Sequence, residues 1–241
     1  MANKLFTLGS ASINVLALSL SNVRQLQEIT NNKVVCGVMA KDFADDGQML
    51  SFIEKLKENE AIISLGLGGG DSTQAVRVVE LSSQCDPAHV NQVFPLASYT
   101  QSLLVSQGKD GLVNALVAPG FTDETVILST GPKSGKLKPV EADCITAAAM
   151  IAEMNIKAVK FFPLNNRLEN MVNLVSSCSK AGIPIFEPTG GINVRSVGEI
   201  VRRCLRAGAE IVIPHVYTSL VKDGRTDYSA FTEVWETLKK L

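Results

Sequence analysis

"KAVKFFPLNNRLENMVNLVSSCSKAGIPIFE", residues 157–187, predicts a strand, a helix and a second strand in succession. The runs 157–162 and 183–187 are short and largely apolar, which favours buried strands. Between them, apolar residues recur at helical spacing, and Gly182 stands where a glycine ends a helix. The stretch therefore predicts one βαβ unit.

The same alternation extends along the chain. Further apolar runs lie at 33–39, 61–67, 89–95, 111–117, 125–129 and 210–215. Most are continuous rather than alternating, as in parallel sheets that are covered on both faces. Eight such strands predict an α/β protein with a single (β/α)8 TIM barrel over residues 1–241, in which 1–32 form an N-terminal lead-in segment. A doubly wound open sheet is the alternative.

One unit departs from this pattern. Only "APGFTDE" (118–124) separates the fourth run from the fifth. Seven residues are too few for a helical crossover between parallel strands. Either this βα unit is truncated, or one of the two runs is not a barrel strand.

The composition limits the classes of partner. Lys+Arg 23 against Asp+Glu 24 gives a net charge of -1, which indicates neither nucleic acid nor a membrane surface as a partner. The five cysteines show no C-x-x-C pair, which favours buried thiols over disulfides or zinc. The N-terminal stretch has a single lysine and an interrupted apolar run, which argues against a secretory signal. We expect a cytoplasmic protein without a metal or an organic cofactor.

Lys160 is unusual because it interrupts a buried strand. Alternation places Ala158, Lys160 and Phe162 on one face, and Val159 with Phe161 suits the layer against the helices. Lys160 is then expected to point into the barrel near the carboxyl end of its strand, the rim where barrel enzymes carry their chemistry. A desolvated amine can attack a ketone and form a Schiff base. Alternatively, its stem packs while the ammonium reaches solvent.

A glycine turn follows the next strand. In "FEPTGGIN" (186–193), Thr189, Gly190 and Gly191 end the strand, and Asn193 is placed to cap a helix. Successive backbone N–H groups at such a turn can bind an anion. The alternative is an ordinary tight turn that needs glycine for its conformation.

Together, "KFFP" and "PTGGI" resemble the 2-keto-3-deoxy-6-phosphogluconate and 4-hydroxy-2-oxoglutarate aldolases, and "ALVAPGFTDE" (115–124) resembles that family's fourth-strand turn. The resemblance is clearest in the C-terminal half, and it is strongest to a divergent bacterial branch of amino-sugar-acid catabolism. It implies a (β/α)8 barrel, a class I mechanism with Lys160 as the Schiff-base lysine, and a homo-oligomer. It also implies that Thr189, Gly190 and Gly191 bind the carboxylate or phosphate end of the substrate.

The chain departs from that family where the general base is expected. The family carries a Glu-x-x-x-Arg pattern on its second strand, but "IISLGLGGGD" (62–71) has neither residue type. Glu187 shares parity with Thr189 and is expected to face the site. We predict that Glu187 carries protons with a pKa raised toward neutrality, with His215 as the second candidate. A structural salt bridge is the alternative for Glu187.

Weaker candidates complete the site. Gly69 and Gly70 lie between a strand and a helix and are candidate substrate- or phosphate-binding residues. Lys133 lies on a glycine-rich loop that either folds over an anionic substrate or stays solvated. His89 begins its strand and is expected on the rim away from the chemistry.

With this resemblance, the sequence favours an aldolase that cleaves a 2-keto-3-deoxy sugar acid, expected to be 6-phosphorylated, into pyruvate and an aldehyde such as glyceraldehyde 3-phosphate. A 4-hydroxy-2-oxoglutarate aldolase stays open. Two further alternatives stay open: a barrel that binds a phosphate without catalysis, and a barrel isomerase. The missing glutamate is the only support for the barrel without catalysis.

Overall fold

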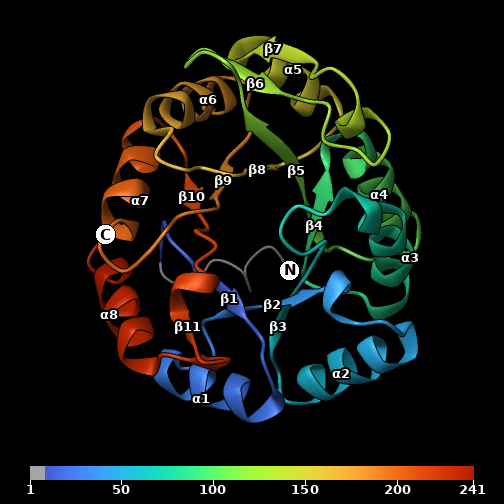
Figure 1. Cartoon of the computed structure of the whole chain (residues 1–241), viewed down its shortest axis with the longest axis vertical. Helices are drawn as coiled ribbons and strands as arrows, with labels where there is room; N and C mark the ends of the chain where they lie inside the picture. The colour runs from blue at the N-terminus through green and yellow to red at the C-terminus, as the bar shows by residue number, and fades with distance from the viewer. Residues whose placement is uncertain (1–8) are drawn as a thin grey trace.

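Parallel strands curl around a common interior in the computed structural model, which describes residues 9–241 (Figure 1). The main sheet has ten strands, and eight of them follow one path of parallel neighbours. Along this path lie β1 (Asn14–Leu16), β2 (Val35–Met39), β3 (Ile62–Gly66), β4 (His89–Val93), β5 (Leu112–Pro119), β8 (Ala158–Phe161), β9 (Ile185–Pro188) and β10 (Ile211–Val212).

The first and last strands of this path meet through the segments beside them. The amide of Ser12 donates to Val212 O at 3.0 Å, and the amide of Val216 donates to Asn14 O at 3.0 Å. Asn14 and His215 also form a parallel bridge. The two edges of the sheet are thus joined by backbone hydrogen bonds, which satisfy polar groups that an open sheet leaves unpaired.

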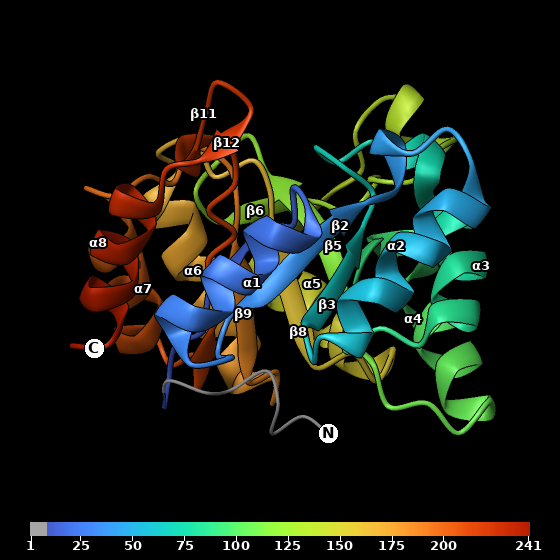
Figure 2. The same ribbon diagram turned by 90° about the horizontal axis from the view of Figure 1, so that it is seen from below.

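Helices cover the outside of the sheet. Figure 2 shows α2, α3 and α4 on one side of the strands and α6, α7 and α8 on the other. The helices are α1 (Leu20–Thr30), α2 (Asp46–Glu58), α3 (Ala75–Cys85), α4 (Phe94–Ser106), α5 (Cys144–Glu153), α6 (Leu168–Lys180), α7 (Val197–Arg206) and α8 (Tyr228–Leu238). Short 3-10 helices are η2 (Ala40–Asp42), η3 (Ser72–Gln74), η4 (Ser134–Lys136) and η5 (Thr218–Leu220). No helix in the described range is long and apolar enough to cross a membrane.

The stretch expected as a lead-in segment is part of the barrel-like sheet. Residues 14–16 pair with β2, and Ser19 caps α1 by accepting a hydrogen bond from the amide of Asn22. The prediction of a lead-in over 1–32 is therefore wrong from residue 14 onward. The strand is only three residues long and contains Asn14, so its apolar signal was too weak to find. Residues 1–8, which the signal-peptide argument also used, lie outside the described part.

The run at 125–129 is not a strand of the parallel path. It supplies β6 (Thr125–Ile127), which pairs antiparallel with β5 and with β7 (Glu141–Asp143). Of the segment 118–124, residues 118 and 119 still belong to β5 and residues 120–124 reverse the chain, and α5 follows β7 as the helix of this unit. The unit is therefore not truncated: residues 120–143, called the insert below, extend it between β5 and α5. A connection as short as 120–124 permits an antiparallel hairpin but not a helical crossover.

Inside the sheet, an apolar layer underlies a polar one. Ala158, Ile185 and Ile213 form a small buried cluster separate from the main core between strands and helices. Lys160, Glu187 and His215 each follow one of these three residues by two positions, so their side chains also point inward. Lys160 and Glu187 lie in β8 and β9, and His215 lies just after β10. The polar layer thus lies toward the carboxyl ends of the strands.

The antiparallel insert is held to α6 by one buried amide. Asn170 Nδ2 donates to the backbone oxygens of Asp123 (2.9 Å) and Thr125 (2.8 Å). We expect Asn170→Ala to lower the free energy of unfolding by about 1–3 kcal/mol, because two backbone oxygens of the insert lose the donor that a fully buried side chain supplies. Asn173→Ala is the matched control, since Asn173 is only half-buried and also donates to Asp123 O (3.0 Å), in an exposed hydrogen bond. The free energy of unfolding of Asn173→Ala, measured by urea titration, should stay within about 0.5 kcal/mol of the wild-type value. Equal losses of stability in the two variants would contradict this account.

Candidate active site

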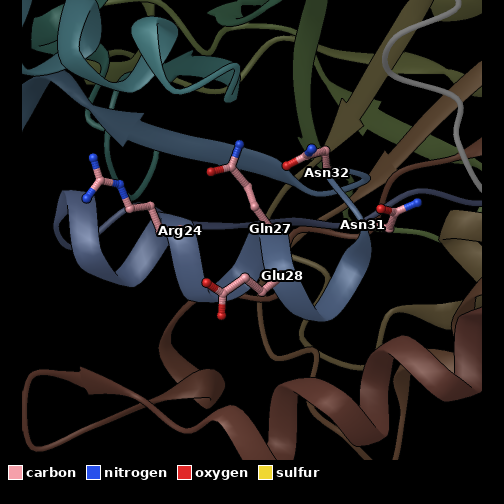
Figure 3. Close-up of a pocket in the computed structure, with 5 residues that line it drawn as sticks. All are labelled: Arg24, Gln27, Glu28, Asn31 and Asn32. Atoms are coloured by element: carbon pink, nitrogen blue, oxygen red, sulfur yellow. The ribbon is translucent and has the colours of Figure 1, made fainter.

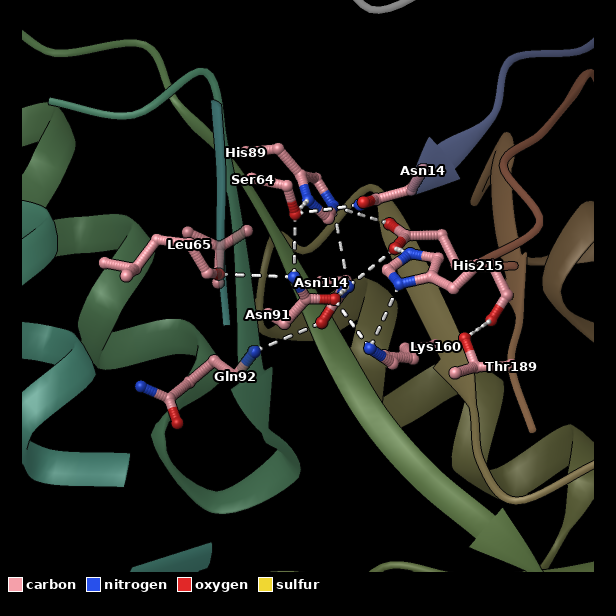
Figure 4. A network of polar contacts seen from close by, with 12 residues as sticks. Asn14, Ser64, Leu65, His89, Asn91, Gln92, Asn114, Lys160, Thr189 and His215 are labelled. Atoms are coloured by element: carbon pink, nitrogen blue, oxygen red, sulfur yellow. Dashed lines mark hydrogen bonds and ion pairs between the residues drawn. The ribbon is translucent and has the colours of Figure 1, made fainter. Parts of the chain in front are cut away.

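Lys160 lies at the centre of the polar layer and is 8% exposed. Its Nζ donates to Asn91 Oδ1 at 2.8 Å and lies 3.3 Å from His215 Nδ1 (Figure 4). Burial lowers the pKa of Lys160 from 10.5 to about 8, and the negative charge of Glu187 opposes this shift. The neutral amine is therefore the main form above about pH 8, well below the pH at which an ordinary lysine loses its proton.

The hydrogen-bond partners of Lys160 suit a nucleophile. A neutral amine has two N–H bonds and one lone pair. Asn91 Oδ1 and His215 Nδ1 can accept both N–H bonds. The lone pair is then left for an electrophile, which is the requirement for attack on a carbonyl carbon.

Glu187 is fully buried and accepts hydrogen bonds on both carboxylate oxygens. Oε1 lies 2.9 Å from His89 Nε2, and Oε2 lies 2.8 Å from His215 Nε2 and accepts from Asn114 Nδ2 at 2.7 Å. Burial alone raises the pKa of Glu187, but the hydrogen bonds from the imidazoles of His89 and His215 outweigh it and hold this pKa well below its usual range. The expectation of a pKa raised toward neutrality is wrong, because the surroundings of Glu187 are polar donors rather than apolar side chains.

A donor count assigns the tautomer of His89. Ser64 Oγ accepts from Asn14 Nδ2 and Asn91 Nδ2, both at 2.9 Å, so its hydroxyl hydrogen is directed to His89 Nδ1 at 2.7 Å. His89 is then neutral with its hydrogen on Nε2, where it donates to Glu187.

His215 has the matching arrangement. Its Nε2–H faces Glu187, and its Nδ1 lone pair faces Lys160. Burial and the positive charge of Lys160 lower the pKa of His215 from 6.5 to about 3, although the contacts with Glu187 oppose this. At neutral pH, His215 is an uncharged base next to the amine.

Tyr217 fills the part of the interior that faces β2. Its hydroxyl donates to Asn14 Oδ1 at 3.0 Å, and its ring lies 5.6 Å from the ring of His215. A Cβ at Gly37 of β2 would lie 2.3 Å from the Tyr217 oxygen. Glycine is required at residue 37 because the tyrosine uses the space of a side chain.

A narrow pocket opens onto Lys160 at the carboxyl ends of the strands. Lys160 and Asn91 share it with Leu116 and Tyr217, and its wall is made by Met39 and by residues 66–70. The structure thus brings the predicted residues Gly69 and Gly70 to the same pocket as Lys160.

The second glycine turn has a different position. Thr189 is buried, and its backbone oxygen accepts from the amide of Leu164 at 2.8 Å. A Cβ at Gly190 would lie 3.1 Å from Pro163 Cα, so this turn packs on the segment after β8. Thr189, Gly190 and Gly191 follow the strand of Glu187, but they are not among the residues that line the narrow pocket.

Lys133 is the predicted residue that stands apart. It is exposed and precedes η4, on the loop after β6, and it does not line the pocket of Lys160.

Two other pockets lie away from this site. One is lined by Arg24, Gln27 and Glu28 of α1 and by Asn31 and Asn32 after it (Figure 3). The other lies at the hairpin of β11 (Val221–Lys222) and β12 (Arg225–Thr226). Both are open to solvent, and neither is lined by the buried amine.

The sequence reasoning missed most of the polar layer, and it misplaced His89. His89 begins β4, but the register pairs it with Ser64 in the middle of β3, so the stagger of the strands brings it level with Glu187. The missed residues are Asn14, Ser64, His89, Asn91, Asn114 and Tyr217. Part of the signal was present, because Asn14, Ser64 and Asn114 are single polar residues within otherwise apolar strands. Residues 9–241 contain no group of three His, Cys, Asp or Glu that could hold a metal ion.

Comparisons with known proteins identify the family of the chain. Residues 9–224 match the family described as KDGP aldolase. The 2-dehydro-3-deoxy-phosphogluconate aldolase of Salmonella typhimurium is 32% identical over 235 residues, which cover 95% of each chain. The chain therefore has an aldolase-type function, that of a lyase.

Solved structures support the fold at low identity. The 3-hexulose-6-phosphate synthase of Salmonella typhimurium matches with a TM-score of 0.59 at 10% identity, covering 95% of this chain and 99% of that one. The 3-keto-L-gulonate-6-phosphate decarboxylase of Vibrio cholerae matches with a TM-score of 0.56 at 12% identity, covering 96% and 98%. These likenesses show a TIM-barrel-type fold, and the sequence match shows the family: the chain belongs to the KDGP aldolase family.

Proposed function

We propose that this protein is a class I aldolase in which Lys160 forms a Schiff base with C2 of a 2-keto-3-deoxy sugar acid. One observation carries the proposal: a buried amine with a lowered pKa lies within hydrogen-bond reach of His215 Nδ1. Burial favours the neutral, nucleophilic form of a lysine. The position of Lys160 at the carboxyl end of β8 also supports an active-site role.

His215 is the proposed proton carrier, and Glu187 holds it in place. When the amine attacks the carbonyl carbon, its surplus proton passes to His215 Nδ1, 3.3 Å from Nζ. The imidazolium that forms is stabilised by the carboxylate of Glu187, 2.8 Å from Nε2. Glu187 itself is a poor proton acceptor because N–H donors occupy both of its oxygens. This division of labour replaces the prediction that Glu187 carries the proton.

The carbinolamine first expels the former carbonyl oxygen as water, which takes its proton from His215, and a positively charged imine remains; cleavage follows from this imine. The positively charged imine withdraws the electron pair of the C3–C4 bond as the hydroxyl on C4 loses its proton and becomes the aldehyde. The enamine that remains takes up a proton at C3, and water then releases pyruvate from Lys160. Electrons and protons balance without an oxidant, a reductant or a cofactor.

The substrate is proposed from the name of the Salmonella relative. We take it to be 2-dehydro-3-deoxy-6-phosphogluconate, which gives pyruvate and glyceraldehyde 3-phosphate. Gly69 and Gly70 contact the substrate beside Lys160, since they line its pocket. Thr189, Gly190 and Gly191 are proposed for the phosphate end, because the turn follows the neighbouring strand and its glycines have φ of 96° and 76°. If the protein were instead a 4-hydroxy-2-oxoglutarate aldolase, it would cleave 4-hydroxy-2-oxoglutarate faster than the phosphorylated sugar acid.

We also propose a cytoplasmic homo-oligomer. Large apolar side chains are exposed on the insert and α5, among them Phe121 (70%), Leu137 (72%) and Ile145 (74%). Several exposed apolar residues on one region support an interface with another copy of the chain.

Trapping with pyruvate tests the Schiff base. We expect pyruvate and borohydride, with EDTA present throughout, to add one reduced pyruvate to Lys160, detected by intact mass and peptide mapping. The rate of trapping should be low below pH 8 and should rise as the pH passes 8, because the amine is mainly neutral above its pKa of about 8. Lys160→Met should give no adduct, whereas Lys157→Met, an exposed lysine at the start of the same run, should be trapped normally. An unmodified wild-type protein would exclude the class I mechanism.

Substitution of the carboxylate tests its role. Glu187→Gln keeps the shape but removes the charge that favours the ammonium form, so the pKa of Lys160 should fall and the trapping profile should shift to lower pH. The kcat for cleavage should fall by ~10²–10⁴, because the imidazolium loses its partner. His215→Asn should lower kcat to a similar extent while leaving the charge of Glu187 in place. A Glu187→Gln enzyme with normal turnover and an unshifted profile would refute the role assigned to this carboxylate.

A further inference from the structure

The loop after β3 is built to let two side chains pack on its backbone. Gly68, Gly69 and Gly70 have φ of 97°, 57° and 73°, a conformation that side chains with a Cβ rarely adopt. A Cβ at Gly68 would lie 2.3 Å from Lys41 Cγ, and one at Gly70 would lie 2.7 Å from Phe162 Cε1. The glycines therefore let Lys41 lie directly along the loop.

Lys41 brings a positive charge to this loop. It belongs to η2, just after β2, and its backbone amide donates to Leu67 O at 3.2 Å. A Cβ at Gly69 would lie 3.3 Å from Lys41 Nζ, so the ammonium group is over the loop. Among residues 9–241, no carboxylate forms an ion pair with Lys41. The nearby carboxylate of Asp71 accepts instead from Thr73, through its amide (3.0 Å) and its hydroxyl (2.6 Å).

The backbone of the loop adds further donors. In the described part of the chain, the amides of Gly69 and Gly70 donate to no protein acceptor. Consecutive amides in a left-handed turn, together with an ammonium group, form a site for an anion. The same loop is a wall of the pocket that contains Lys160.

We propose that Lys41 and the amides of Gly69 and Gly70 bind the C1 carboxylate of the keto acid, rather than its phosphate. This rests on the proposed Schiff base at Lys160. C1 is bonded directly to C2, so a carboxylate at C1 must lie in the pocket where Lys160 holds C2. The C6 phosphate is at the far end of the carbon chain and is free to reach another loop. Lys41 is thus a binding residue that selects 2-keto acids over neutral ketones.

Borohydride trapping with two ketones tests this assignment. Pyruvate carries the carboxylate, and hydroxyacetone offers a similar ketone without a negative charge. For Lys41→Met we expect the half-saturating concentration of pyruvate to rise ~10- to 100-fold, the effect of losing a charge-assisted contact. The half-saturating concentration of hydroxyacetone should stay unchanged. Lys41→Arg should recover most of the affinity for pyruvate, and Lys55→Met, an exposed lysine of α2, should behave like the wild type.

The outcomes separate this proposal from the proposed function. Wild-type protein that pyruvate does not trap at all would overturn the Schiff base, and this proposal with it. Wild-type trapping with an unchanged pyruvate dependence in Lys41→Met would overturn the carboxylate site alone. If Lys41→Met leaves the pyruvate dependence unchanged but raises the KM for the phosphorylated substrate, Lys41 would be assigned to the phosphate instead. An equal loss for pyruvate and hydroxyacetone would show a general change in the pocket and would also overturn the proposal.

Discussion

The ionised carboxylate of Glu187 is the constraint on which the polar interior depends. A buried charge without partners is very costly, so every neighbour of Glu187 must present a hydrogen. His89, His215 and Asn114 do so, from β4, from the segment after β10 and from β5. Because His215 gives its Nε2–H to Glu187, its Nδ1 is left as an acceptor toward Lys160. The carboxylate thereby sets the state of the amine without touching it.

Much of the fold followed from the sequence because hydrophobic periodicity is local. The alternation of strands and helices required only short apolar runs and helical spacing, and the inward parity of Lys160 and Glu187 required only the two-residue repeat of a strand. The short first strand and the antiparallel β6 did not follow. Apolar residues favour both kinds of pairing, and the partner of a strand is set by tertiary contacts.

The site was harder to predict than the fold for a related reason. His89 and Asn114 meet Glu187 across distances of 98 and 73 residues in the chain. Their meeting depends on the stagger of neighbouring strands, which no local pattern encodes. The pKa of Glu187 was misjudged for the same reason: the apolar strand in which it stands does not show the donors that face it from other strands.

The space shared by Gly37 and Tyr217 has a consequence for divergence among related sequences. Gly37 of β2 has no side chain, and the ring of Tyr217, from a distant segment of the chain, fills that space. The summed volume of the two side chains is therefore limited by one space in the interior. A larger residue at 37 is tolerable only with a smaller one at 217, and the hydroxyl that orients Asn14 would then be lost. We therefore expect substitutions at the two positions to arise together.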